Sequence, residues 1–119
     1  MNFPIFYTNS NILIPSNSAG CTRVFLIPFI FIRKKYRDDI GLHAHEAMHS
    51  KQAWRHILPP IHAIRYALSK SYRLKCEVEA YREQLKYYPD DRRLLFAEFI
   101  SCDYGLDINY ASALELLNK

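Results

Sequence analysis

Histidines gather in the stretch from Gly41 to Trp54, where positions 45 to 49 read His-Glu-Ala-Met-His. Residues four apart lie on one face of an α-helix, with Cβ atoms about 5–6 Å apart. The imidazoles of His45 and His49 can therefore converge on one ion, at the spacing zinc takes from two ligands on a single helix. Glu46 lies about 100° further round, where its carboxylate can accept a proton from a metal-bound water.

A second segment is needed to complete such a site, because catalytic zinc usually has three protein ligands and one open position. The candidates lie in Glu77-Val78-Glu79-Ala80-Tyr81, on a predicted helix that can return antiparallel to the first. Either Glu77 or Glu79 would give a set of two histidines and one carboxylate.

These two segments together resemble the gluzincin metallopeptidases, and most of all the minimal single-domain gluzincins and the prenyl-protein and heat-shock membrane proteases. In that pattern the third zinc ligand is the glutamate that begins the motif E-x-x-A-D. The resemblance therefore implies Glu77 as the ligand and Ala80 as a small packing residue. Tyr81 replaces the aspartate that hydrogen-bonds a zinc histidine, and its hydroxyl is the available substitute. A rival frame, Glu79 with Glu83, resembles the E-x-x-x-D of thermolysin-like enzymes but lacks the alanine, so we prefer Glu77.

The resemblance covers residues 24–85 and extends to the strand that precedes the histidine helix. The segment ending Ile32-Arg33-Lys34-Lys35-Tyr36-Arg37-Asp38-Asp39 is similar to the family's edge strand. The resemblance implies that a peptide substrate lies along this strand as an added β-strand.

Other polar residues near the motif are weaker candidates for the metal site. Gln52 lies on the same stripe as the two histidines and is expected to support the site. His56 is about 10 Å along the helix from His49 at ~1.5 Å per residue, too far to share the ion. His43 points to the opposite side, and His62 is a rival to Glu77 or a candidate for stabilising an oxyanion. Tyr36 is a further oxyanion candidate, although an ordinary edge-strand role suits it better.

Nucleophilic catalysis finds little support. Cys76 has no histidine on its own predicted helix and is expected to be a buried free thiol. Ser50 and Ser69 lack a nucleophile-elbow motif.

Composition limits the partners and the compartment. The net charge of +4 and the single dense basic run, Arg33 to Arg37, do not predict a nucleic-acid partner. The most hydrophobic run, Val24 to Ile32, is nine residues with a proline inside, whereas a spanning helix needs about 20, so no membrane partner is expected. Three widely spaced cysteines and the absence of a signal-peptide pattern predict a cytoplasmic protein.

The secondary-structure elements expected to position these residues are strands in the first third of the chain and helices in the rest. Residues 1–39 read as strands and turns, with strand candidates at 11–14 and 24–35, and Pro28 makes the second an edge strand or splits it. Helices are predicted over 40–55, 61–70, 72–88, 92–104 and 110–119, with Asp38 or Asp39 capping the first. We expect one α+β domain over residues 1–119, with two or three short antiparallel strands packed on a mostly helical part.

The combined prediction is a zinc-dependent metallopeptidase that acts on a peptide or protein substrate. His45, His49 and Glu77 would bind Zn²⁺, and Glu46 would activate the water. Two alternatives stay open: a zinc-stabilised domain that binds a protein partner without catalysis, and a small basic nucleic-acid-binding protein without metal.

Overall fold

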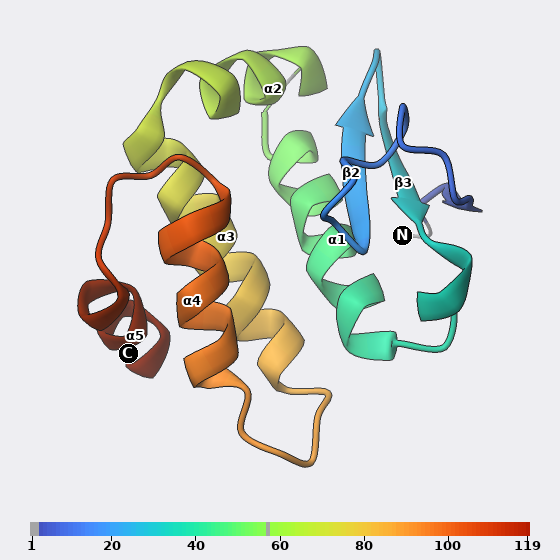
Figure 1. Ribbon diagram of the computed structural model, residues 1–119. Coiled ribbons are helices and arrows are strands. Elements are labelled where there is room, and N and C mark those ends of the chain that lie inside the picture. The colour runs from blue at the N-terminus through green and yellow to red at the C-terminus, as the bar shows by residue number, and fades with distance from the viewer. Residues whose placement is uncertain (1–2, 57) are drawn as a thin grey trace.

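A three-stranded sheet and five α-helices form the part of the chain that the structure, a computed structural model, describes: residues 3–56 and 58–119 (Figure 1). The strands are β1 (Ile5–Tyr7), β2 (Gly20–Val24) and β3 (Pro28–Ile32), and the helices are α1 (Ile40–Trp54), α2 (Pro59–Leu68), α3 (Lys70–Leu85), α4 (Arg93–Asp103) and α5 (Tyr110–Asn118). A short 3₁₀ turn, Lys34–Tyr36, precedes α1. The predicted α+β class is confirmed.

The sheet has the order β1-β3-β2. β2 and β3 pair antiparallel, as expected for the strands of this region, but β1 pairs parallel to β3. The predicted 24–35 strand is divided at the hairpin turn, and Pro28 begins β3 opposite Val24, where a missing backbone donor is tolerated. The strand predicted at 11–14 is wrong: these residues form a turn, and Ile14 is buried within it.

β3 is the central strand rather than an edge strand. Its sequence, PFIFI, is almost continuously buried, as expected for a strand covered on both faces. Ile30 and Ile32 pack against Leu42 of α1. A peptide therefore cannot add to β3, and the expectation that the strand leading into α1 offers a free edge is wrong.

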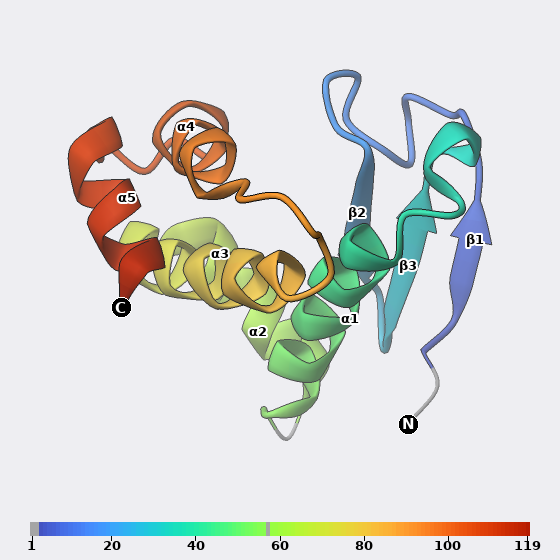
Figure 2. The same ribbon diagram turned by 90° about the horizontal axis from the view of Figure 1, so that it is seen from below.

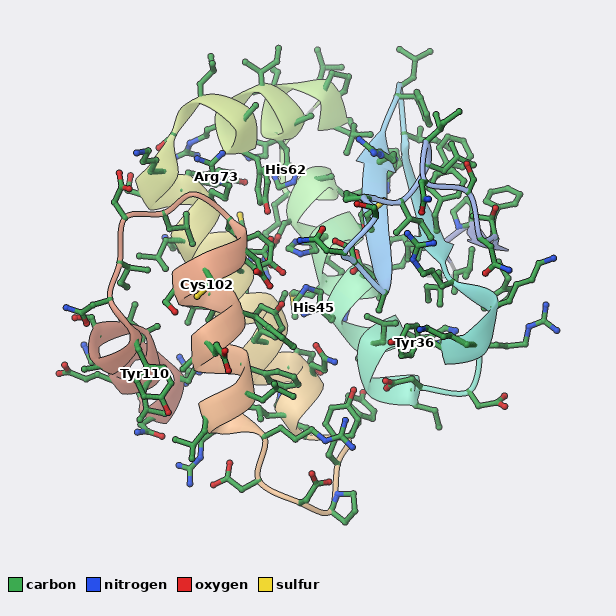
Figure 3. The ribbon with its side chains drawn as sticks, in the orientation of Figure 1. Tyr36, His45, His62, Arg73, Cys102 and Tyr110 are labelled. Atoms are coloured by element: carbon green, nitrogen blue, oxygen red, sulfur yellow. The ribbon has the colours of Figure 1, made fainter. Side chains whose placement is uncertain are left out.

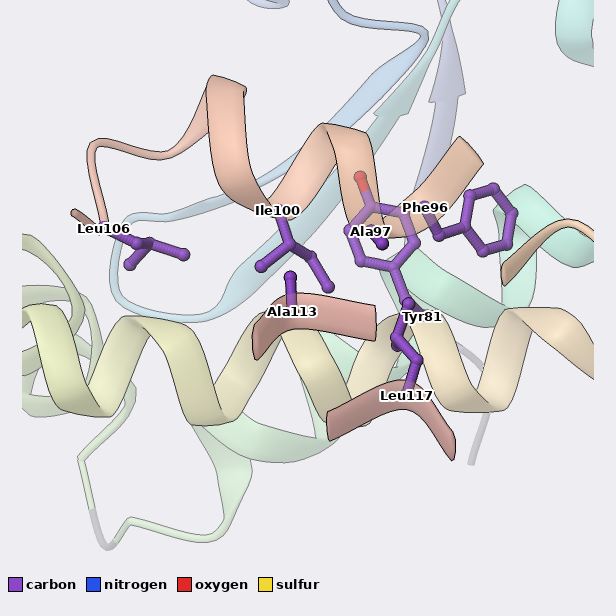
Figure 4. Close-up of a cluster of buried hydrophobic side chains, with 7 residues drawn as sticks. All are labelled: Tyr81, Phe96, Ala97, Ile100, Leu106, Ala113 and Leu117. Carbon is purple, nitrogen blue, oxygen red and sulfur yellow. The ribbon is translucent and has the colours of Figure 1, made fainter. Parts of the chain in front are cut away.

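Helix α1 lies between the sheet and α3, and α4 and α5 pack beside α3 on the side away from the sheet (Figure 2). A second apolar cluster forms there (Figure 4). It consists of Tyr81, Phe96, Ala97, Ile100, Leu106, Ala113 and Leu117. α1 and α3 are thus each held by a hydrophobic cluster on their outer sides, and they face each other with polar side chains.

The start of α1 is also tied directly to α3. Asp39 caps the helix by accepting a hydrogen bond from the backbone N–H of Leu42 at 3.0 Å. The hydroxyl of Tyr88, just beyond α3, donates to the Asp39 carboxylate at 2.7 Å, and Gln84 donates to that hydroxyl at 2.7 Å. The Tyr88 ring lies over Gly41, where an added Cβ would come within 2.5 Å of it. Gly41 therefore permits this close approach.

Candidate metal centre

His45 and His49 converge on the inner face of α1, as their spacing predicts. Both are buried, and their Nε2 atoms lie 3.2 Å apart with the rings nearly perpendicular at 79°. Figure 3 shows His45 of α1 and His62 of α2 on the interior sides of their helices. Two imidazoles on one helix thus present the same ring nitrogen to one point.

Glu77 on α3 completes the group. Its Oε1 lies 3.4 Å from Nε2 of His45, and its Oε2 lies 3.1 Å from Nε2 of His49. A tetrahedral ion with bonds of about 2.0–2.1 Å separates its ligand atoms by about 3.3 Å. The 3.2 Å between the two imidazole nitrogens is close to that edge length, and each carboxylate oxygen lies at a similar distance from one of them. One ligand atom from each of the three residues lies within 4.8 Å of the others. The donor set of two imidazoles and one carboxylate fits zinc.

The electrostatics of this group favour a cation. The Glu77 carboxylate is only 1 % exposed, and its Oε1 is buried without a hydrogen-bond partner among the described residues. Burial disfavours a charged His49, but the adjacent carboxylate outweighs burial and raises the pKa of His49 to about 9. Burial likewise opposes ionisation of Glu77, yet His49 and His45 hold the pKa of its carboxyl well below its usual range. Without an ion, the protonated His49 is the positive partner of this buried carboxylate, and a metal ion bound here would replace that proton.

Gln52 orients His49 as the sequence predicts. Its side-chain nitrogen donates to the carboxylate of Glu79 at 2.8 Å and to the Cys76 carbonyl at 3.0 Å. Its oxygen therefore faces His49 and accepts from Nδ1 at 2.9 Å, which leaves Nε2 of His49 for a metal. Arg55 pairs with the same Glu79 carboxylate. The structure thus brings Glu77, not Glu79, to the two histidines.

His45 lacks such an orienting partner. Its Nδ1 is buried without a hydrogen bond among the described residues. Tyr81 packs its ring edge-on against His45 at 4.3 Å between centroids, but its hydroxyl bonds to the Tyr104 hydroxyl at 2.6 Å. The expectation that the Tyr81 hydroxyl replaces the family's aspartate is therefore wrong, and Tyr81 contributes shape and an apolar wall.

Glu46 is held by a residue that sequence reasoning missed. The Thr22 hydroxyl, on β2, lies 2.9 Å from Oε1 of Glu46 and 3.0 Å from its backbone oxygen. Glu46 is buried and lines the same cleft as the two histidines. No local motif marks Thr22, because only the packing of β2 on α1 brings it there.

Helix α2 closes the other side of the cleft with His62 and Tyr66, which lie one helical turn apart. The Tyr66 hydroxyl donates to Oε2 of Glu77, and burial beside this carboxylate raises the pKa of Tyr66 far above its usual value, so it stays protonated. His62 bonds through Nδ1 to the Tyr72 hydroxyl at 2.7 Å. Tyr66 was not singled out from the sequence, although its spacing from His62 placed both on one face.

The remaining candidates lie outside the metal-ligating group. His43 contacts the Tyr7 hydroxyl on the sheet side. His56 is held by Tyr72 at 3.0 Å, so neither histidine joins the ligand set. Tyr36 lines the cleft, but it packs against the sheet-side apolar cluster. Burial raises the pKa of the Cys76 thiol to about 11, which gives it no nucleophilic thiolate at neutral pH.

The cleft has a volume of about 880 Å³ and is lined by residues of β2 together with residues of the four helices α1 to α4. Hydrogen bonds join Arg33 N–H to Ala19 C=O at 2.9 Å and Phe25 N–H to Ile27 C=O at 3.1 Å. Because bonded pairs alternate along an antiparallel ladder, Cys21 and Arg23 bond to β3. The backbone groups of Gly20, Thr22 and Val24 therefore face the free edge of β2, and this edge belongs to the strand that borders the cleft.

His62 is expected to make the fold less stable in mild acid. Burial lowers its pKa from 6.5 to about 4, so the unfolded chain takes up the proton first as the pH falls. The stabilisation is complete above pH 6.5 and is lost as the pH falls towards 4. His62→Asn should therefore show a smaller drop in the urea-unfolding midpoint between pH 7 and pH 4.5 than the wild type. An equal drop in both proteins would contradict this assignment.

No protein-family model, curated protein or solved structure matches this chain. The geometry of the site itself therefore indicates its chemistry. Two imidazoles and one carboxylate converge with one ligand atom from each within 4.8 Å of the others. A second carboxylate, that of Glu46, lines the same cleft.

Proposed function

We propose that this protein is a zinc-dependent metallopeptidase of the gluzincin type. The observation that carries the proposal is the meeting of His45, His49 and Glu77 from two helices, with the two imidazole nitrogens 3.2 Å apart and a carboxylate oxygen within 3.4 Å of each. The match to H-E-x-x-H with E-x-x-A supports the same class. Three protein ligands favour catalysis over a structural role, because structural zinc sites normally close the fourth position with another side chain.

Zinc in such a site polarises a carbonyl group and lowers the pKa of bound water to about 7. The chain's own residues carry the proton transfers. Glu46 is positioned to take a proton from the attacking water and return it to the leaving amine. The hydrogen bond from Thr22 holds that carboxylate in place.

His62 is the strongest candidate for a donor to the carbonyl oxygen of the substrate. It is neutral at pH 7 because burial lowers its pKa to about 4, and it lines the cleft. When Tyr72 donates to Nδ1, Nε2 carries the hydrogen and can donate to a developing oxyanion. Tyr66, one turn further along α2, already donates its hydroxyl hydrogen to Glu77, so His62 is the donor that this wall offers.

An extended peptide is the substrate that the cleft suits best. The free edge of β2 offers the backbone groups of Gly20, Thr22 and Val24, which can pair with a peptide as an added strand. A peptide bound there would lie beside Glu46, since the Thr22 side chain contacts it. A cytoplasmic location and a single domain over residues 1–119 remain predictions from the sequence.

A non-enzymatic zinc-binding domain is the second candidate, because the ligands join α1 to α3 and an ion would cross-link them. The two functions differ in one measurement. The metallopeptidase is expected to purify with one zinc per chain and to cleave an unfolded, fluorescently labelled protein, with loss of activity when a chelator removes the metal. One zinc without any cleavage would favour the binding domain, and absence of zinc binding would overturn both.

A further inference from the structure

Helix α2 carries its apolar stripe on the outside. Ile61, Ile64 and Leu68 are 48 %, 60 % and 82 % exposed, whereas the polar side chains of His62 and Tyr66 face the cleft. A surface helix normally turns its apolar stripe towards the core. Within the described part of the chain nothing covers this stripe, so its apolar character is not explained by the packing of the fold.

A second apolar projection lies at the same end of the molecule. The turn between β2 and β3 exposes Phe25, Leu26 and Ile27 by 59 %, 82 % and 39 %. Figure 1 shows this hairpin tip and α2 together at the end where α1 finishes. Trp54, at the end of α1, is also 42 % exposed. We call the outer stripe of α2 and the hairpin tip together the apolar end face.

The segments that form the apolar end face carry mostly basic charged residues. Between Glu46 and Glu77 the sequence has no acidic residue and six basic ones: Lys51, Arg55, Arg65, Lys70, Arg73 and Lys75. The first 37 residues, which include the hairpin, also lack an acidic residue. Two acidic residues from outside these segments form ion pairs with basic residues within them: Glu79 pairs with Arg55, and Asp107 pairs with Lys70. Among the described residues, Arg23 and Arg65 form no ion pair with a carboxylate.

We propose that the apolar end face docks on the surface of an anionic phospholipid bilayer. Isoleucine, leucine and phenylalanine side chains would enter the boundary between headgroups and acyl chains, and the surrounding arginines and lysines would contact lipid phosphates. A short helix and a hairpin tip that project from the same end suit a planar surface. None of the described helices is long and apolar enough to cross a bilayer, and surface docking requires none. The expectation of no membrane partner considered only a crossing segment.

Charge argues against the two other occupants. A symmetric dimer through this face would place the same basic residues of both copies against each other, which opposes association. Nucleic acid would satisfy the arginines but would leave the exposed Leu26, Ile64 and Leu68 without apolar contacts. The proposal does not depend on the metallopeptidase assignment, since it uses different side chains.

Co-sedimentation with vesicles tests the proposal. The wild-type protein should pellet with vesicles of phosphatidylcholine and about 30 % phosphatidylserine, less with phosphatidylcholine alone, and less at high salt. The variant Ile64→Glu/Leu68→Glu should bind the anionic vesicles roughly tenfold or more weakly, because two apolar contacts become charged. Leu94→Glu on α4 is the control, since Leu94 is as exposed as Ile64, at 60 %. It should bind like the wild type.

Two further measurements make every outcome decisive. Circular dichroism and zinc content should be the same in all three proteins, which shows that the substitutions act on the surface. Trp54, the single tryptophan of the chain, should shift its emission to the blue with anionic vesicles. Absence of pelleting, or an equal loss in Leu94→Glu, would overturn the proposal. Self-association in the absence of lipid that Ile64→Glu/Leu68→Glu abolishes would instead identify the face as a dimer contact and also overturn it.

Discussion

Glu46→Gln is expected to bind zinc as the wild type does and to lose peptidase turnover by roughly 10²–10⁴-fold, the usual contribution of a general acid–base group. The amide has the shape of the carboxylate and can still accept the hydrogen bond from Thr22. It cannot take a proton from water. Neither metal ligation nor packing changes, so the loss falls on the chemical step.

The measurement compares kcat/KM on a fluorogenic unstructured peptide with zinc content determined on the same preparations. Glu98→Gln, an exposed residue of α4, is the matched control and should retain full activity. Unchanged turnover in Glu46→Gln would refute the mechanism, even if the protein binds zinc. Loss of zinc in this variant would show that Glu46 belongs to the ligand set.

Glu77→Gln should weaken zinc binding by at least roughly 100-fold, whereas Glu79→Gln should weaken it by less than about tenfold. Both residues lie on α3, but only Glu77 reaches Nε2 of His45 and His49, at 3.4 and 3.1 Å. Glu79 acts on the site only through Gln52, and a glutamine there can still accept that hydrogen bond. Removing the buried anion at Glu77 takes away the charge that attracts the cation.

Competition with a chromogenic chelator gives the zinc affinity of each variant directly. The thermal unfolding midpoint of each zinc-free protein shows whether a variant has lost its fold rather than its ligand. The opposite ranking, with zinc lost in Glu79→Gln and kept in Glu77→Gln, would favour the thermolysin-like frame and contradict the geometry described above.

The helical part of the site could be predicted from sequence because its signals are local. The spacing of His45 and His49 is a property of one helix. Helix ends are also local, since Asp39 caps α1, Asn109 caps α5 and prolines begin α2. The preference for Glu77 over Glu79 came instead from the resemblance to the E-x-x-A pattern, and its alanine, Ala80, is completely buried.

The rest of the site depends on contacts between distant segments, which local patterns do not encode. Thr22 reaches Glu46 only because β2 packs on α1, and the parallel pairing of β1 with β3 depends on how the chain turns between residues 8 and 19. Tyr81 was misjudged because its hydroxyl had a better partner in Tyr104, on a helix end remote in sequence. The apolar residues of α2 also mislead, since their stripe is exposed rather than buried.

Helices α1 and α3 are fastened to each other beyond both ends of the candidate metal centre. The Tyr88 hydroxyl holds Asp39 at one end, and Gln52 and Arg55 hold Glu79 at the other. The separation of the two helices is therefore set by the polypeptide before any ion enters. Selection among divalent metals would then depend on how well the geometry that each ion prefers fits this fixed separation, and cobalt(II) would enter as a coloured reporter without rearranging the backbone.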